Sequence, residues 1–404
     1  MEPIIKSLLD LDLYKLTVLQ IIFNLFSNIE ARYEFTCRNK EKLDLLRYVP
    51  EDELREQLFK HLATLKLTDE EYRYVLSKGY YSKTFAQYLY NFRFLPEEQL
   101  TVKRDEENRT YRIIANGPWA GIILYETLVL SIVNEIFARN YTKNNKCSPI
   151  NDGIKHLSEK ICTLTEYNVE SIADGFDVPK LLEFGTRRRY SQLWQKNVIK
   201  TLITDCPHNL IGTSNVAFSK EFNIKEIGSF GHELPMGLQG LYPVQHSQRQ
   251  AFKIWLSEYR GQWGTALTDT LGDARFFKDF SFELAKGFDS CRHDSGDPFI
   301  FGEKIVCMYE NYDIDPLTKR LLFSDGLNFD TMIKLHRRFR GRIGLAFGIG
   351  TDLTNHMDIP VPQVVMKITM ANSQDVCKLS ANPAKASCNN QQYLDYVRMA
   401  IERY

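Results

Sequence analysis

The sequence predicts an α/β protein in which a parallel sheet or barrel follows an α+β N-terminal domain. The first observation is a series of short apolar runs beyond about residue 180, each followed by a polar or glycine-rich cluster and then a helical pattern. The second is their spacing, because most lie roughly one βα unit apart, as in parallel strands joined by crossover helices. The third is length, since 404 residues are enough for two domains or for one barrel with an appendage.

Local patterns predict the N-terminal elements. The apolar segment from Leu13 to Phe26 predicts a buried helix, because it is shorter than a membrane span and contains several polar residues. Residues 31–38 alternate apolar and polar side chains, which predicts a half-buried strand. We expect charged helices over 50–95, a hairpin over 100–115 and a second buried helix from Ile122 to Phe137. Together these elements predict an α+β domain.

Six short strands are predicted in the second half of the chain. They cover Leu181–Phe184, Leu210–Gly212, Thr265–Thr268, Phe288–Cys291, Leu321–Ser324 and Ile343–Phe347. After Ser247, apolar residues recur at helical spacing, which is typical of a crossover helix. The active site of such a sheet or barrel lies at the carboxyl ends of its strands, so the polar clusters found there are the candidate functional residues.

Composition argues against several classes of protein. The 51 basic and 51 acidic residues balance, so no overall charge attracts nucleic acid or an anionic membrane. The eight cysteines show neither a Cys-x-x-Cys pair nor zinc-site spacing, and we interpret them as reduced thiols. No basic leader precedes the first apolar segment. We therefore expect a cytoplasmic protein, with nuclear residence left open.

The most informative motif runs from Arg292 to Pro298 and reads Arg-His-Asp-Ser-Gly-Asp-Pro. A cation, two carboxylates, a hydroxyl and a glycine at one turn suit a phosphorylated sugar, although the same residue types form ordinary surface turns. Thr186 to Arg189 follows a glycine and offers three adjacent cations to phosphate oxygens, or alternatively a solvated helix start. Gly212 to Asn215 supplies small hydroxyl and amide groups, which alone is a weak signal.

The segment from Glu226 to Gln245 is rich in glycine and proline and shows hardly any regular pattern, which is typical of a functional loop or lid. It contains His232, a candidate for chemistry, with His246 as the nearest competitor. The Asp-Gly pair near residue 326 and the Gly-x-Gly-Thr motif near 351 are typical of turns whose backbone amides bind a phosphate. The P-loop pattern does not occur in the sequence.

Taken in order, five motifs resemble the nicotinate phosphoribosyltransferase family. They are Ser7 to Lys15, Glu183 to Arg189, Gly212 to Asn215, Arg292 to Pro298 and Phe347 to Thr351, and the resemblance extends from residue 7 to about 380. It implies a reaction that joins nicotinate to phosphoribosyl pyrophosphate, gives nicotinate mononucleotide and pyrophosphate for NAD salvage, and is coupled to ATP hydrolysis. It also implies a sandwich-like α/β domain over 1–140, completed by 360–404, on an irregular α/β barrel over 141–359.

The resemblance also implies roles for individual residues. His232 takes the position of a histidine that ATP phosphorylates, and Asp294 joins it as a catalytic residue. The nicotinate site is expected from Tyr14, Phe184, Ser214, Ser229 and Arg292, with the aromatic rings on the base, Arg292 on its carboxylate, and Ser214 selecting nicotinate over nicotinamide. Phosphoribosyl pyrophosphate is expected at Arg187, Asp269, Asp294, Gly326, Gly350 and Thr351. ATP and Mg²⁺ are expected as well, without assigned metal ligands.

Alternatives remain at this point. In relatives such a tyrosine as Tyr14 is sometimes donated by a second subunit, so a homodimer is expected from the resemblance. The nicotinamide and quinolinate phosphoribosyltransferases are the nearest rival enzymes. A catalytically silent metabolite-binding relative and an unrelated phosphate-binding barrel are the remaining interpretations. If the protein is one of these enzymes, we expect it to bind small-molecule substrates and neither nucleic acid nor a membrane.

Overall fold

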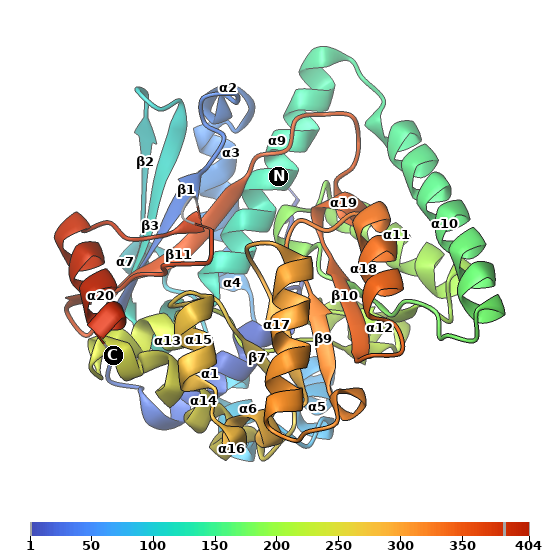
Figure 1. Cartoon of the computed structure of the whole chain (residues 1–404). Helices are drawn as coiled ribbons and strands as arrows, with labels where there is room; N and C mark the ends of the chain where they lie inside the picture. The colour runs from blue at the N-terminus through green and yellow to red at the C-terminus, as the bar shows by residue number, and fades with distance from the viewer. Residues whose placement is uncertain (1, 383–384, 404) are drawn as a thin grey trace.

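The computed structural model describes residues 2–382 and 385–403, and in them two separate sheets are surrounded by helices (Figure 1). An antiparallel sheet has the order β12-β11-β1-β3-β2, and a parallel sheet has the order β6-β5-β4-β10-β9-β8-β7. No pairing joins β6 to β7 in the described residues, so the parallel sheet is a curled, open half-barrel. The predicted fold class, an irregular barrel with an α/β N-terminal part, is confirmed.

The antiparallel sheet joins segments from both ends of the chain. Its strands are β1 Glu30–Cys37, β2 Leu100–Asp105, β3 Thr110–Pro118, β11 Val364–Ala371 and β12 Gln374–Asp375. β11 pairs with β1 along its length, from Ala31 opposite Ala371 to Cys37 opposite Val364. In Figure 1 the orange-red strand β11 accordingly lies beside the blue strand β1.

Two helices of the N-terminal half, α1 Leu13–Leu25 and α9 Tyr125–Asn145, are mostly buried. The other helices of this half are α2 Leu45–Tyr48, α3 Glu51–Arg55, the π-helix η1 Glu56–His61, α4 Leu62–Thr64, α5 Asp69–Ser77, α6 Lys83–Asn91, α7 Pro96–Gln99 and α8 Trp119–Ile122. The stretch Trp119–Asn145 is long and apolar enough to cross a membrane, but 89% of its most apolar window is buried inside the protein. That is the environment of a core helix, as the apolar patterns predicted for this helix and for α1.

The parallel sheet contains every strand predicted for the second half. Its strands are β4 Leu181–Glu183, β5 Leu210–Thr213, β6 Lys225–Glu226, β7 Thr265–Leu267, β8 Ser290–His293, β9 Arg320–Phe323 and β10 Gly344–Ile349. The short edge strand β6 was not predicted. The predicted start of β8 was wrong, because the backbone N–H of Phe288 still donates to Leu284 in the preceding helix at 2.9 Å. Arg292 therefore lies inside this strand.

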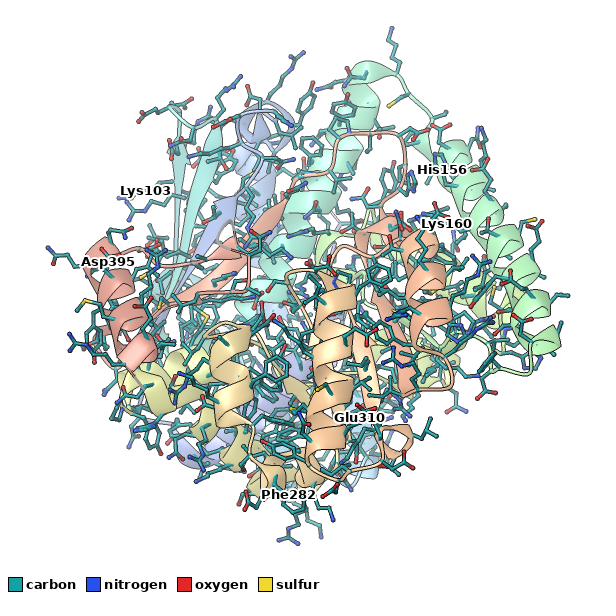
Figure 2. All side chains as sticks on the ribbon, viewed as in Figure 1. Lys103, His156, Lys160, Phe282, Glu310 and Asp395 are labelled. Carbon is teal, nitrogen blue, oxygen red and sulfur yellow. The ribbon has the colours of Figure 1, made fainter. Side chains whose placement is uncertain are left out.

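Helices connect and cover the parallel strands. They are α10 Pro149–Ala173, the 3₁₀ turn η2 Thr186–Arg188, α11 Gln192–Asp205, α12 Val216–Phe222, α13 Glu233–Gly237, η3 Leu238–Gly240, α14 Val244–Tyr259, α15 Asp273–Asp279, α16 Phe282–Gly287, α17 Pro298–Asn311, η4 Pro316–Thr318, α18 Phe329–Phe339, α19 Thr351–Thr354 and α20 Gln391–Arg403. One apolar core contains residues of both sheets and does not separate two domains. The domain boundaries at 140 and 359 therefore stay predictions. Charged side chains such as Lys103, Glu310 and Asp395 project from the outer surface (Figure 2).

Two residues of the polar motifs start helices. Asp297 accepts hydrogen bonds from the backbone N–H groups of Phe299 and Ile300 and so caps α17, which begins at Pro298. Asn215 accepts a hydrogen bond from the N–H of Phe218 and caps α12 in the same way. These caps point each helix away from the preceding strand, so the other polar residues of the motif stay at the strand end.

Candidate active site

A cavity of about 120 Å³ lies where the carboxyl ends of the parallel strands face the antiparallel sheet. Its wall contains many of the residues predicted from the sequence, namely Tyr14, Phe184, Arg187, Ser214, Ser229, His232, Arg292 and Asp294. Tyr33 of β1 and Lys367 of β11 complete the wall from the antiparallel sheet. Motifs that are far apart in the sequence therefore share one cavity.

The start of α1 is fixed against the end of β5. Asp12 and Asn215 form an antiparallel bridge, and the N–H of Leu13 donates to the carbonyl oxygen of Ser214 at 2.8 Å. This contact brings Tyr14 to the cavity from the same chain. Tyr14 thus reaches the cavity of its own chain, and the homodimer stays a prediction.

Tyr14 and Phe184 both line the cavity. Neither ring stacks on another aromatic side chain in the described part of the protein, although the core contains many such pairs. The Tyr14 hydroxyl donates to Glu126 at 3.3 Å, and the Arg187 guanidinium lies 5.6 Å from the Tyr14 ring centroid. Two aromatic rings in a small cavity suit a planar ligand that stacks on one or both of them.

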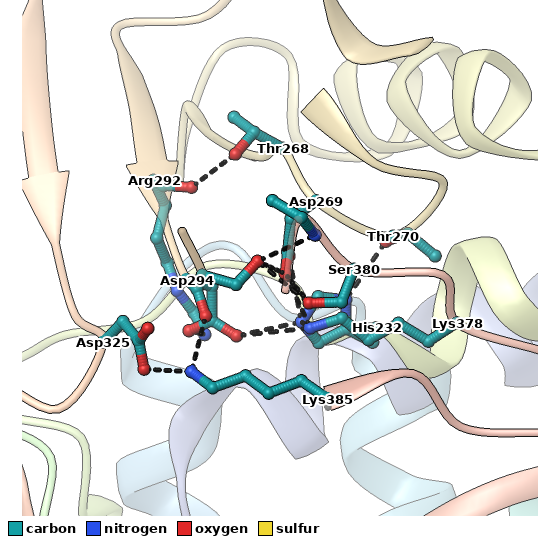
Figure 3. A network of polar contacts seen from close by, with 12 residues as sticks. His232, Thr268, Asp269, Thr270, Arg292, Asp294, Asp325, Lys378, Ser380 and Lys385 are labelled. Carbon is teal, nitrogen blue, oxygen red and sulfur yellow. Dashed lines mark hydrogen bonds and ion pairs between the residues drawn. The ribbon is translucent and has the colours of Figure 1, made fainter. Parts of the chain in front are cut away.

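His232 lies in the cavity wall at the centre of a polar network (Figure 3). Its Nδ1 is 3.1 Å from the Thr270 hydroxyl, and its Nε2 is 3.0 Å from Asp294 Oδ2 and 3.3 Å from Asp269 Oδ1. The ammonium of Lys378 is 2.9 Å from the same Nε2. The imidazole is therefore held on both nitrogens, and only a small part of its side chain is exposed.

The environment of His232 keeps its ring neutral. Burial and then the charge of Lys378 together lower the pKa of His232 to about 4, although Asp269 and Asp294 oppose the shift. At neutral pH the ring therefore carries a lone pair on one nitrogen. A neutral imidazole is the form that acts as a nucleophile.

Arg292 and Asp294 form a connected pair on the cavity wall. Arg292 Nη2 donates to Asp294 Oδ1 at 2.8 Å, its Nε donates to Ser324 at 3.0 Å, and its Nη1 donates to Ser229 at 3.2 Å. Burial disfavours the Asp294 carboxylate, but Arg292, His232 and Lys378 outweigh burial and hold its pKa well below its usual value. Asp294 is therefore ionised, and the Nη1 edge of Arg292 lies next to a serine hydroxyl.

The surroundings of Ser214 differ from the sequence prediction. The Ser214 hydroxyl donates to Asp12 Oδ1 at 2.7 Å, so the carboxylate of Asp12 lies beside the neutral residue. Arg187 Nε is 3.2 Å from the other oxygen of Asp12. The sequence prediction did not include Asp12, which lies just before α1 and contacts Ser214, and the role of Ser214 in selecting nicotinate stays a prediction. Arg187 balances the charge of Asp12.

Three lysines near the cavity had no counterpart in the sequence prediction. Lys378 is 2.7 Å from Asp269 Oδ2, and Lys385 pairs with Asp325 and donates to the backbone of Asp294 at 3.3 Å. Lys367 lines the cavity, and burial lowers its pKa to about 7, with Lys378 as the next cause. No motif marks these lysines, because all three come from the segment that follows the barrel. Of the three, only Lys367 lines the cavity itself, and Lys378 and Lys385 pair with carboxylates beside it.

Comparison with known proteins agrees with the site. The N-terminal domain profile of the nicotinate phosphoribosyltransferase (NAPRTase) family matches residues 9–134, and the profile of the family itself matches residues 179–403. The nicotinate phosphoribosyltransferase of Acinetobacter baylyi is 40% identical over 404 residues, which is 100% of this chain and 97% of that protein. The chain belongs to the nicotinate phosphoribosyltransferase family.

Solved structures of the nicotinate phosphoribosyltransferase family share the fold over almost the whole chain. The nicotinate phosphoribosyltransferase from Vibrio cholerae has a TM-score of 0.92 at 36% identity, and the match covers 99% of this chain and 94% of that protein's chain. That from Porphyromonas gingivalis has a TM-score of 0.86 at 29% identity and covers 99% of both chains. Both sheets are therefore part of the family fold.

The segment from Glu226 to Gln245, predicted as a functional loop or lid, lines the cavity but has more regular structure than predicted. Most residues from Ser229 to Gln239 are buried, and the segment contains α13 and η3. Its glycines serve close packing, since a methyl group added at Gly237 would lie 2.2 Å from the Trp119 ring. His246, the competitor of His232, is exposed on α14 and does not line the cavity.

The three adjacent arginines do not act together on a ligand. Arg189 is fully buried and pairs with both oxygens of Asp10, at 2.6 and 2.8 Å, so it is a structural residue. Arg188 donates to the backbone oxygen of Val364 at 3.1 Å. Arg187 alone lines the cavity, which corrects the prediction of three phosphate-facing cations.

Four residues predicted to hold phosphoribosyl pyrophosphate lie outside the cavity wall. Asp269 is fully buried directly behind His232. Gly326 follows β9 with a φ of +56°, a conformation that favours glycine. Gly350 precedes α19, and a methyl group added there would lie 2.9 Å from the carbonyl oxygen of Phe184. Because α19 has only four residues, phosphate binding by Gly350 and Thr351 depends on their backbone amides and stays a prediction.

His232, Asp269 and Asp294 offer ligand atoms that lie within 4.8 Å of one another. This group does not fit Mg²⁺, which prefers a nearly complete set of oxygen ligands. Lys378 already neutralises Asp269, and Arg292 neutralises Asp294. We therefore assign no magnesium ligand to this group.

Proposed function

We propose that the chain is a cytoplasmic nicotinate phosphoribosyltransferase that forms nicotinate mononucleotide and pyrophosphate for NAD salvage. The observation that supports this most is the cavity itself. Two aromatic rings, Tyr14 and Phe184, share it with the Arg292 and Ser229 pair and with the Asp294 carboxylate. A pyridine ring that bears a carboxylate matches this combination of aromatic faces, a guanidinium and a hydroxyl.

The proposed reaction is a displacement at the anomeric carbon of the ribose. The pyridine nitrogen forms a bond to this carbon while the bond to pyrophosphate breaks, so positive charge develops on the ribose and negative charge on the leaving group. The ionised Asp294 faces the ribose, and Arg187 with Lys367 and Lys385 faces the phosphates. Magnesium is proposed to enter with the pyrophosphate group as part of the substrate.

ATP coupling is proposed to proceed through His232. The lone pair of the neutral ring attacks the γ-phosphorus of ATP, a nitrogen–phosphorus bond forms, and ADP leaves. Hydrolysis of this phosphohistidine to phosphate then drives the condensation. The low pKa of His232 and its bonds to Thr270 and Asp294 support this role, because they keep the ring neutral and oriented.

A substrate panel tests the proposed function. Purified protein is incubated with phosphoribosyl pyrophosphate and with nicotinate, nicotinamide or quinolinate, each with and without ATP, and pyrophosphate release is measured. We expect release with nicotinate and its stimulation by ATP. Preference for nicotinamide or quinolinate would show that the protein has one of the rival activities. If no base gives pyrophosphate release, the protein would be a catalytically silent metabolite-binding relative.

Replacing Ser214 with aspartate is expected to weaken nicotinate use selectively. The new carboxylate would lie beside Asp12 and near the substrate carboxylate, and like charges repel. We expect the KM for nicotinate to rise by about tenfold or more, which corresponds to about 1.4 kcal/mol. Ser214→Asn is the matched control, since it has a similar size without the charge. Equal losses in the two variants would show that size rather than charge matters.

The His232 ring is expected to remain neutral far below the usual histidine range. In the unfolded chain a histidine binds a proton near pH 6.5, whereas His232 in the folded protein does so at about 4. Its contribution to stability is thus fully present above pH 6.5 and is lost as the pH falls toward 4. Selective ¹³C labelling of histidine and NMR titration, with assignment by His232→Ala, measures this pKa.

In the same titration, Lys378→Met is expected to raise the pKa of His232, because it removes a neighbouring positive charge. A His232 resonance that titrates near pH 6.5 in the unaltered protein would contradict the proposed environment.

A further inference from the structure

The chain folds back on itself just beyond β12. Lys378 and Ser387 exchange both of their backbone hydrogen bonds, each at 2.9 Å, and so form an antiparallel bridge. Cys377 and Cys388 are the next residues outward on the two arms. In antiparallel pairing, the pair next to a hydrogen-bonded pair is the closer kind, with Cα atoms about 4.5 Å apart. This separation lies within the range that a disulfide spans.

The two thiols have unequal surroundings. Cys377 is fully buried, and its backbone exchanges hydrogen bonds with the Gln239 side chain at 2.7 and 2.9 Å. Cys388 is partly exposed. The Cys388 thiol donates to the backbone oxygen of Asn390 at 3.1 Å, and the interaction between the two neighbouring thiols lowers the pKa of Cys388 while it raises that of Cys377. Cys388 is thus the thiol that ionises and that solvent reaches, with a buried partner directly beside it.

The arms between these cysteines carry groups that contact the site. Lys378 contacts Asp269 and His232, and Lys385 contacts Asp325 and Asp294. We propose that Cys377 and Cys388 are a redox-sensitive pair whose reversible disulfide fixes this returning segment, residues 377–382 and 385–388, against the catalytic cavity. The function proposed above uses neither thiol.

The oxidant is proposed to be hydrogen peroxide or another small peroxide. The Cys388 thiolate attacks the peroxide, the oxygen–oxygen bond breaks, and a proton completes the departing water, which leaves a sulfenic acid on Cys388. The Cys377 sulfur then attacks the Cys388 sulfur, its proton passes to the leaving hydroxyl, and a second water departs as the disulfide forms. A dithiol reductant reverses the reaction by thiol–disulfide exchange.

Peptide mapping tests the proposal on the full chain. Protein exposed to a small excess of hydrogen peroxide is alkylated and digested with trypsin without reduction. Because trypsin cleaves after Lys378 and Lys385, the disulfide would join the peptides 368–378 and 386–398, each of which contains one cysteine. We expect this joined species, lighter by two hydrogens than the sum of the two peptides, and we expect dithiothreitol to separate it. Cys388→Ser should prevent it, whereas Cys307→Ser, on the exposed face of α17, should not.

The effect on turnover is measured on the same samples. In the proposed reaction Lys385 must exchange the Asp325 carboxylate for a ligand phosphate, so a fixed segment is expected to lower nicotinate-dependent pyrophosphate release several-fold, with recovery after dithiothreitol. Cys388→Ser protein should lose this response. Absence of the joined peptide, or a joined peptide with no reversible change in turnover, would overturn the proposal. The mass measurement needs no activity, so failure of the proposed function would be seen separately.

Discussion

Replacing His232 with alanine is expected to abolish labelling of the protein by γ-phosphate-labelled ATP. The imidazole is the neutral nucleophile that Thr270 and Asp294 hold in position, and alanine offers no acceptor nitrogen. We expect labelling and ATP-stimulated pyrophosphate release to fall by about 100-fold or more, the scale on which such side chains contribute to catalysis. The label should be acid-labile and base-stable, and its quantity after gel filtration in base is the measurement.

His246→Ala is the matched control for this variant. His246 is exposed on α14 and does not line the cavity, so its loss should leave labelling unchanged. Circular dichroism checks that His232→Ala protein is folded. Persistent labelling of folded His232→Ala protein would show that another residue accepts the phosphoryl group.

Replacing Asp10 with alanine is expected to produce the largest loss of stability. Asp10 and Arg189 are both fully buried, and the carboxylate pairs with both terminal nitrogens of the guanidinium. Burial acts against the Asp10 charge, but Arg189 outweighs it and lowers the pKa of Asp10. Without Asp10, the buried guanidinium loses its main partner, which costs about 3–5 kcal/mol. The free energy of unfolding in urea measures the loss.

Glu221→Ala provides a comparison for this variant. Glu221 pairs with Lys196 on the surface, where both side chains are about two-fifths exposed, so its removal should cost less than about 1 kcal/mol. Similar losses in the two variants would mean that the Asp10 pair contributes no more than a surface pair.

The strand ends of the barrel could be predicted from the sequence because their signal is local. A short apolar run followed by a polar cluster identifies the end of a buried strand, and parallel strands bring such ends to one rim. Phe184, Ser214 and Arg292 were located in this way and share the cavity. The glycine-rich segment made His232 a candidate, and the resemblance to the family gave it a role and added Tyr14, which no periodicity distinguishes from a structural residue.

The rest of the site depends on contacts that a linear pattern does not contain. Glycines that pack against Trp119 and Tyr14 produce the same local pattern as a mobile loop, so the buried segment around His232 was predicted as a lid. Arg189 resembles its neighbours in the sequence, and only the distant Asp10 makes it structural. Lys367 and Lys378 reach the site because β11 pairs with β1.

The pairing of β11 with β1 has a consequence for protein synthesis. A ribosome releases the chain from its N-terminus, so β1 emerges more than 300 residues before the strand that lies beside it. Until then one edge of β1 has no partner, and the lysines of the pocket do not yet exist. The nascent polypeptide therefore cannot complete its binding pocket before almost all of it has been translated.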